Sequence, residues 1–170
     1  MNILNAVLFN ATWFGCVLGG ELWGAIPLLF MGIQAVWNKS HLDFILAGIL
    51  GSFGWILDSA WVAIGILDYH GLDVAPVWIV ILWCALGLSI NKCMRWFHDR
   101  AVLGAFLAST AAPFSYLSAE RFGAVIVTDI YGLGAIGLTW LVLFGCLFNL
   151  LQKVGTVSYT HLTLPTIYSV

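Results

Sequence analysis

Residues 42–67 read LDFILAGILGSFGWILDSAWVAIGIL, an apolar stretch whose only charged side chains are Asp43 and Asp58. A helix needs about 20 predominantly apolar residues to cross the hydrocarbon core of a bilayer. This stretch exceeds that length, so we expect it to tilt or to break near Gly51 and Gly54. It predicts a membrane-spanning helix with one acid buried well inside it.

The composition of the whole chain agrees with a membrane protein. Of its 170 residues, 62% are hydrophobic and 8% are charged, which leaves too few polar side chains to cover a soluble domain of this size. Five more apolar stretches cover residues 3–19, 22–37, 76–97, 101–119 and 131–151. The sequence therefore predicts an all-α, polytopic membrane helix bundle with six transmembrane helices. Segment 122–130 is read as an interfacial or re-entrant piece, or as an extension of the sixth helix.

Charged residues divide between the two sides of this six-helix arrangement. One side holds most of the basic residues, and the other holds five acids with one arginine. The first group is Lys39, Lys92, Arg95, Arg100 and Lys153, and the second is Glu21, Asp68, Asp73, Glu120, Asp129 and Arg121. Because basic residues favour cytoplasmic loops, we expect both termini in the cytoplasm.

The C-terminal residues differ abruptly from the rest of the chain. Residues 157–166 read VSYTHLTLPT, which corresponds to one reading frame of a transposase-type sequencing adapter. We therefore expect one transmembrane domain over residues 1–155, followed by a non-native segment over residues 156–170 that carries no function.

Asp58 is the strongest candidate for a functional residue, since an acid inside an apolar helix is costly. At 100° per residue, Ala47, Gly51, Gly54 and Gly65 share its face, so a neighbouring helix can approach there and Asp58 points into the bundle. Two interpretations stay open. Asp58 is a proton relay, a ligand for an ion or headgroup, or a general acid; otherwise it is a structural hydrogen-bond link between helices.

Three more polar residues extend this candidate intramembrane site. Asn10 and Asn91 each lie inside a predicted helix, and Asn91 shares a face with Arg95. Tyr116 follows Pro113, where a kink frees a backbone carbonyl that a hydroxyl can satisfy. For all three, a structural hydrogen bond is favoured over a direct functional role.

Two further groups of residues point to lipids. Lys92, Arg95 and Arg100 are candidates for contacts with anionic headgroups, although the same residues also account for the topology. Tryptophans deep in the helices either line an isoprenoid or acyl pocket or simply pack; they are Trp13, Trp55, Trp61, Trp83 and Trp140.

Other classes of function are disfavoured. The four cysteines show no CxxC pair or ligand spacing, so no metal site and no cofactor are expected. A net charge of −2 without an extended basic patch disfavours nucleic-acid binding. No known catalytic motif is present in a suitable position.

Several segments together carry a family resemblance. They are FNATWFGCVLG at 9–19, LDS at 57–59, PVW at 76–78, INK at 90–92 and PFSY at 113–116. The chain resembles the DUF2878 family of small bacterial inner-membrane proteins of unknown function. It departs from the family pattern at Asn10, where a glutamine is expected, and at Ala112, where a glycine is expected. The resemblance implies an association with enzymes that modify fatty acids in the membrane.

Three functions follow as hypotheses. The first is an accessory protein that binds membrane lipids beside a lipid-modifying enzyme partner. The second is a small proton-linked transporter or permease that works as a homo-oligomer. The third is an integral-membrane, lipid-modifying enzyme with Asp58 as its acid, which requires Asp58, Asn10 and Asn91 to face one site.

Overall fold

Six α-helices account for most of the chain in a computed structural model, which describes residues 3–160 and their side chains as far as Lys153. The elements in chain order are α1 (Ile3–Gly19), α2 (Glu21–Trp37), α3 (His41–Ala63), β1 (Leu67–Asp68), α4 (Val77–Ile90), the 3₁₀ helix η1 (Arg95–Arg100), α5 (Ala101–Arg121), β2 (Ile126–Val127) and α6 (Gly132–Thr160). The predicted all-α bundle of six helices is confirmed.

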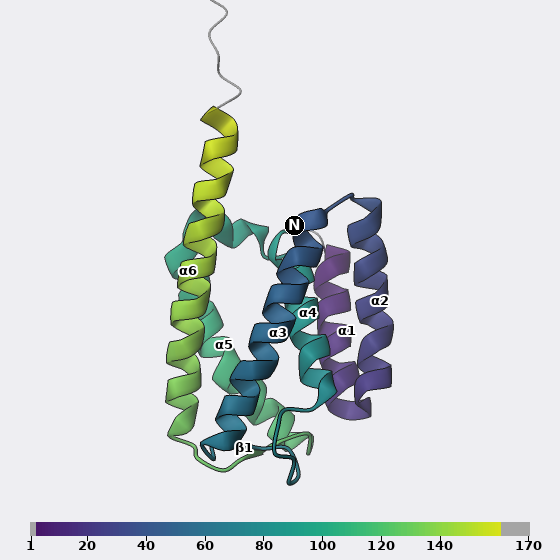
Figure 1. The fold of residues 1–170 in the computed structure, drawn as a ribbon, viewed down its shortest axis with the longest axis vertical. Coiled ribbons are helices and arrows are strands. Elements are labelled where there is room, and N and C mark those ends of the chain that lie inside the picture. The colour runs from purple at the N-terminus through teal and green to yellow at the C-terminus, as the bar shows by residue number, and fades with distance from the viewer. Residues whose placement is uncertain (1–2, 161–170) are drawn as a thin grey trace, which may run out of the picture.

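The helices form two groups. Helix α4 lies in the middle of the first group, where it contacts α1, α2 and α3, whereas α5 and α6 pack against each other as a hairpin (Figure 1). The N-terminus and the last turns of α6 lie at the same end of the bundle (Figure 1). Below, this is called the η1 end, and the opposite end is called the β end because β1 and β2 lie there.

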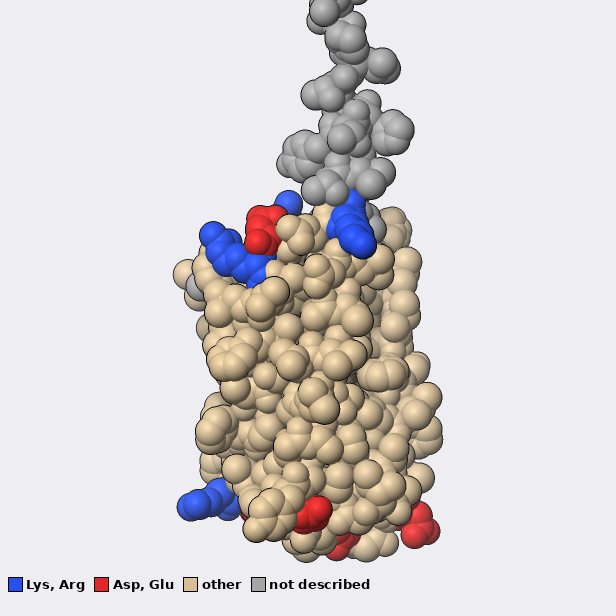
Figure 2. Space-filling model, turned by 90° about the vertical axis from the view of Figure 1, so that its left-hand side faces the viewer, with Lys and Arg blue, Asp and Glu red and all other residues tan. Residues whose placement is uncertain are grey.

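The outer surface is apolar in the manner of a protein surrounded by lipid. Trp37 and Val102 are each 83% exposed, and the face shown in Figure 2 has a wide band without charged side chains between its two ends. Three helical segments are long and apolar enough to cross a membrane: His41–Ala63, Arg95–Arg121 and Gly132–Lys153. The other three helices are apolar but shorter.

Small residues let α3 and α4 approach closely. A Cβ on Gly54 would overlap the indole ring of Trp83, and a Cβ on Gly87 would lie 2.6 Å from the backbone nitrogen of Ala47. A Cβ on Gly51 would lie 2.6 Å from Cys84 Sγ. The prediction that a helix packs on the small-residue face of Asp58 is therefore confirmed for α4, because no side chain at these positions separates the backbones.

Gly65 does not belong to that face, because α3 ends at Ala63 and not at residue 67. Gly65 has φ +76°, its N–H bonds Val62 O at 2.9 Å, and the N–H of Ile66 bonds Trp61 O at 2.9 Å. These two bonds form a Schellman motif, in which glycine supplies the left-handed conformation that ends a helix. Asp58 consequently lies only about five residues, or roughly 7.5 Å, from the end of α3.

The predicted fourth helix is also too long. It ends at Ile90, with Asn91 as its C-cap, and the chain then turns into η1 instead of remaining α-helical to residue 97. Asn91 is therefore not inside a helix. Its side chain bonds Asp43 of α3 at 2.8 Å, and the same turn places Lys92 beside Asp43. These two contacts stabilise the end of the helix at this point.

The segment at residues 122–130 is neither a re-entrant piece nor an extension of α6. Its strand β2 pairs with β1 in an antiparallel ladder that sets Leu67 opposite Val127 and Asp68 opposite Ile126. Because β1 follows α3 and β2 follows α5, this ladder connects the two helix groups at the β end. Thr128 Oγ1 strengthens the connection with a 2.6 Å bond to Gly65 O.

The proposed end of the native domain, at residue 155, falls within the long helix α6. The backbone of α6 continues through Thr160, past the expected boundary at residue 155. Residues 161–170 lie outside the described residues, so the non-native origin of segment 156–170 stays a prediction.

Candidate functional site

Asp58 is the centre of a buried polar cluster near the β end. Its Oδ1 accepts hydrogen bonds from the hydroxyls of Tyr69 at 2.8 Å and Tyr116 at 2.7 Å, and its Oδ2 accepts one from Trp83 Nε1 at 3.0 Å. The Asp58 side chain is fully buried. Three neutral donors thus satisfy this acid, with no ion pair to a basic residue among the described side chains.

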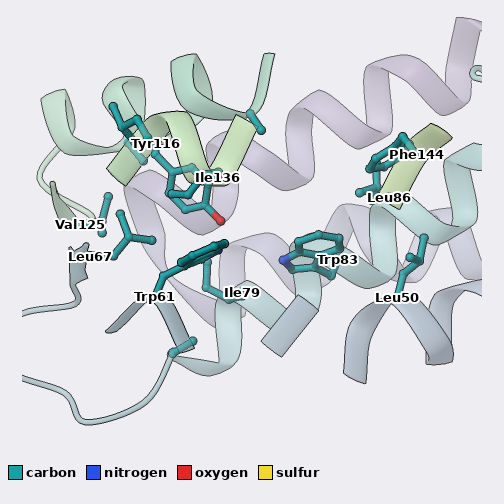
Figure 3. Packing of buried hydrophobic residues seen from close by; sticks show 14 of the residues in the cluster. Leu50, Trp61, Leu67, Ile79, Trp83, Leu86, Tyr116, Val125, Ile136 and Phe144 are labelled. Carbon is teal, nitrogen blue, oxygen red and sulfur yellow. The ribbon is translucent and has the colours of Figure 1, made fainter. Parts of the chain in front are cut away.

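Four different segments bring these groups together. Asp58 lies on α3, Trp83 on α4 and Tyr116 on α5, whereas Tyr69 lies in the loop after β1 and folds back over the acid. Figure 3 shows Tyr116 and Ile136 on one side of this region and Trp61, Ile79 and Trp83 on the other, with their side chains pointing toward one another. Since Tyr116 is on α5, its bond to Asp58 links the two helix groups.

The loop that carries Tyr69 is itself fixed in place. Trp55 Nε1 donates to Ala75 O at 2.8 Å, and the N–H of Ala75 donates to Ser59 Oγ at 3.1 Å. On the other flank, His70 Nε2 and Gly123 O are 2.8 Å apart. These contacts hold the loop over the end of α3, so that Tyr69 closes the cluster from the β end.

Tyr69 lies outside the membrane-spanning helices, and its surroundings favour its neutral form. Burial is the main cause that raises the pKa of Tyr69 well above its ordinary value of 10.0, and the neighbouring charge of Asp58 acts in the same direction. Tyr69 therefore stays a hydrogen-bond donor to Asp58 throughout the physiological pH range.

An apolar space lies beside this cluster, between the two helix groups. One cavity of about 90 Å³ borders Trp83 and Tyr116, and a second of about 270 Å³ extends toward the η1 end. The two share six lining residues: Phe9, Trp13, Leu86, Ala112, Ser115 and Trp140. Asp58 and Tyr69 line neither cavity, whereas the other two donors to Asp58, Trp83 and Tyr116, line the smaller one.

The size and lining of these cavities indicate what they can hold. A water molecule needs two to four polar partners, whereas an apolar cavity of about 150 Å³ stays dry and can bind a molecule such as benzene. The larger cavity exceeds that volume, and its lining is almost entirely aromatic and aliphatic. It is therefore suited to a hydrocarbon chain and poorly suited to an ion or a polar metabolite.

The structure brings only part of the predicted site together. Tyr116 contacts Asp58. The sequence suggested instead that its hydroxyl bonds the carbonyl freed by Pro113, and it does not. Asn10 is exposed and its Nδ2 bonds the backbone oxygen of Ala6 at 2.8 Å. Asn10 and Asn91 thus do not converge on Asp58, and the enzyme hypothesis loses the shared site that it requires.

Asn91 belongs to a second polar cluster at the η1 end. Its Nδ2 donates to Oδ1 of Asp43, and Lys92 Nζ lies 3.2 Å from Oδ2 of the same acid. Asp43 is fully buried, and only 15% of the Lys92 side chain is exposed. The structure thus places Lys92 against Asp43, while the two other proposed headgroup residues, Arg95 and Arg100, are exposed.

Arg100 is held in a defined position. Its guanidinium carbon lies 4.2 Å from the centre of the Trp96 ring, and its Nη1 donates to Trp96 O at 3.3 Å. This cation–π contact leaves the guanidinium on the surface of η1. Among the residues that the structure describes, no three His, Cys, Asp or Glu side chains gather where they could hold a metal ion.

Sequence reasoning missed Tyr69 and Asp43. Tyr69 lies in a predicted loop, and no local pattern shows that this loop folds back over α3. Asp43 carried a usable signal, because antiparallel neighbours α3 and α4 place the start of one helix beside the end of the other. An acid in the first turn of α3 therefore faces the Asn91–Lys92 pair.

These features first define a class: an all-α bundle with an apolar outer surface and helices able to cross a membrane. Within that class, the chain matches the family described as "Protein of unknown function (DUF2878)" over residues 2–146, and it belongs to this family. No curated protein and no solved structure matches the chain.

Proposed function

We propose that this protein is a polytopic protein of the bacterial inner membrane that holds one lipid chain between its two helix groups, as an accessory factor in membrane-lipid modification or stress response. The observation that carries the proposal is the pair of adjoining apolar cavities bordered by α1, α4, α5 and α6. They extend along α4 from Trp78 to beyond Leu86, where Met94 and Phe97 continue the lining.

The connections between the helix groups support this role. Large side chains bridge the groups: the rings of Trp83 and Trp140 are 4.9 Å apart, and Trp13 Nε1 donates to Ser115 Oγ at 2.9 Å. Polar contacts close the β end, and η1 contacts α5 and α6 at the other end. A space fixed at both ends but apolar along its length matches an extended hydrocarbon chain.

A test of the proposal fills the cavity. Ala112 lines both cavities and is buried, so Ala112→Phe places a ring in the space. Lipid mass spectrometry of purified protein is expected to show about one bound lipid per wild-type chain and at most about a fifth of that in the variant. Ala108→Phe, which enters only the larger cavity, is a second filling variant.

Ala135→Phe is the matched control because Ala135 is exposed on α6 and lines neither cavity. It is expected to keep the wild-type lipid content, as is Asp58→Asn, since Asp58 is not in contact with the space. Circular dichroism and gel filtration confirm that each variant is folded. Equal lipid in wild type, both filling variants and the control would overturn the proposal.

The transporter hypothesis makes a different prediction for Asp58. If protons pass through Asp58, Asp58→Asn abolishes flux into proteoliposomes without lowering the protein level. The lining near the η1 end argues for the lipid role instead, because Phe144, Phe148 and Leu107 offer no polar path away from the cluster. Membrane lipids are therefore the proposed partners, and flux that survives in Asp58→Asn excludes the proton route.

A further inference from the structure

The indole N–H of Trp140 is buried and has no hydrogen-bond partner among the described side chains and backbone. The indoles of Trp13, Trp55 and Trp83 show the usual outcome, since each donates to an oxygen. A buried donor without an acceptor carries a free-energy cost, so native structures rarely leave one without a function or a bound partner. The described residues therefore leave the Trp140 N–H free to bond an acceptor on a molecule in the cavity.

Trp140 lies where a molecule bound in the cavities could supply the missing acceptor. Its side chain lines both cavities in the part that they share. The ring is fixed by stacking on Phe144, with centroids 5.1 Å apart and an interplanar angle of 13°, and by contact with Trp83. A ring held on two sides cannot easily turn its N–H toward another acceptor.

Ser115 adds a second polar group to the lining that the two cavities share. Its Oγ accepts the N–H of Trp13, and its side chain lines both cavities. A serine hydroxyl that accepts one bond still has its own proton to donate. Trp140 and Ser115 thus bring donor capacity to an otherwise apolar space.

The charge of the lining restricts the acceptor further. No Lys, Arg or His is among the described residues that line these two cavities. An anionic carboxylate or phosphate buried there would lack a countercharge, which is costly in an apolar environment. A neutral carbonyl oxygen fits both the donors and the absence of cations.

We infer that the bound chain carries a neutral carbonyl oxygen, as in a fatty acyl ester, and that Trp140 Nε1 and the Ser115 hydroxyl bind it. This inference rests on the proposed function, because it identifies the chemistry of the lipid in the same cavity. It also accounts for the two hydrogen-bond donors in an otherwise apolar lining, because a pure hydrocarbon chain would leave both without a partner.

Nuclear magnetic resonance of the indole N–H groups tests the inference directly. Full-length protein labelled with ¹⁵N-tryptophan is delipidated in detergent and titrated with methyl palmitate or with hexadecane, and Trp140→Phe assigns the Trp140 signal. Methyl palmitate is expected to shift the Trp140 signal downfield, whereas hexadecane is not. Methyl palmitate is also expected to bind at least about fivefold more tightly than hexadecane, an advantage that falls to within about twofold in Trp140→Phe and is reduced in Ser115→Ala.

Two other tryptophans are internal controls. Trp55 already donates to Ala75 O, so its signal should not move. Trp61 Nε1 also lacks a partner among the described groups but lines neither cavity. A shift of Trp61 equal to that of Trp140 would mean that the ester reaches any unbonded indole, and this would overturn the inference.

The remaining outcomes separate the inference from the proposed function. If both probes shift Trp13 and Trp83 but neither shifts Trp140, a chain binds without carbonyl recognition, and only the inference fails. If neither probe shifts any cavity tryptophan, both proposals fail. Sodium palmitate at pH 8 that binds as tightly as methyl palmitate would overturn the requirement for a neutral acceptor.

Discussion

At the scale of single residues, the Asp58 cluster shows how a buried acid is satisfied without a basic partner. Two phenol hydroxyls and one indole N–H donate to its oxygens. A neutral amide at this position cannot reproduce the arrangement, because an asparagine presents one acceptor oxygen and one donor nitrogen. In one orientation of the amide, its NH₂ group faces the N–H of Trp83.

Asp58→Asn is therefore expected to lower the free energy of unfolding by about 1–3 kcal/mol, the usual cost of leaving a buried polar group unmatched. Thermal unfolding followed by tryptophan fluorescence in detergent measures this loss. Asp73→Asn, at an exposed position in the loop before α4, is the control and should unfold like the wild type. An unchanged midpoint in Asp58→Asn would contradict a structural role for the cluster.

Tyr69 gives the cluster a pH dependence at alkaline pH. Because burial raises the pKa of Tyr69, the folded protein holds this proton more tightly than the unfolded chain does. The stabilisation is complete below about pH 10, the pKa of an unperturbed tyrosine, and is lost as the pH rises beyond it. Between about pH 9 and 11, the unfolding temperature of wild type should fall more steeply than that of Tyr69→Phe.

The comparison is made between variants at each pH, so that effects of detergent and of the other tyrosines cancel. Tyr131→Phe is the matched control, since Tyr131 is 89% exposed. Parallel curves for wild type and Tyr69→Phe would show that the Tyr69 proton makes no difference to stability.

The sequence identified Asp58 for a physical reason that holds in the structure: an acid within an apolar helix must find partners. Those partners were only partly predictable. Tyr116 was singled out through Pro113 and not through Asp58, and Tyr69 is brought in by a loop. Contacts between side chains that are far apart in the sequence depend on the conformation of the connecting loop. A single sequence carries little information on that conformation.

At the scale of elements, α3 and α4 pack closely because the glycines at their contact have no side chains to keep the two helices apart. Gly54 and Gly48 lie on the same helix but differ in their surroundings. A Cβ on Gly54 would overlap the Trp83 ring, whereas a Cβ on Gly48 meets nothing within 4 Å. The two glycines therefore separate the effect of packing from that of helix propensity.

Gly54→Ala is expected to destabilise the protein by about 1–3 kcal/mol, the usual cost of overpacking. Gly48→Ala should be neutral or stabilising by up to about 1 kcal/mol, because alanine is the better helix former. Thermal unfolding of the two variants in the same detergent decides the point. Equal effects at the two positions would show that α3 and α4 are not in close contact at Gly54.

The extent of the helices was predictable where apolar periodicity decides it. Helices α1, α2, α5 and α6 begin within a few residues of their expected starts, but α3 and α4 end early. Their ends are set by a Schellman turn at Gly65 and by the Asn91–Asp43 bond. Apolar composition continues past both points, so hydropathy alone could not locate either end.

At the scale of the whole molecule, the distribution of basic and acidic residues predicts that both termini face the cytoplasm. The fold agrees with this distribution, because it places the two kinds of charge mainly at opposite ends. Lys and Arg gather mainly at one end of the face in Figure 2 and Asp and Glu mainly at the other. The cavity, by contrast, was only an alternative interpretation of the deep tryptophans. The cavity exists because the two helix groups stand a certain distance apart. Many contacts together set that distance, so no single segment of the sequence predicts it.

Cysteine labelling in intact cells tests the orientation with both termini inside. In a background without the native cysteines, Asn38→Cys places an exposed thiol between α2 and α3 at the η1 end, and Asp73→Cys places one between β1 and α4 at the β end. If the basic end faces the cytoplasm, a membrane-impermeant maleimide should label Asp73→Cys in intact cells and Asn38→Cys only after permeabilisation. The reverse pattern would mean that buried partners such as Asp43 cancel enough of the basic charge to alter the orientation. Labelling of both sites in intact cells would show that the bundle does not separate them across a membrane.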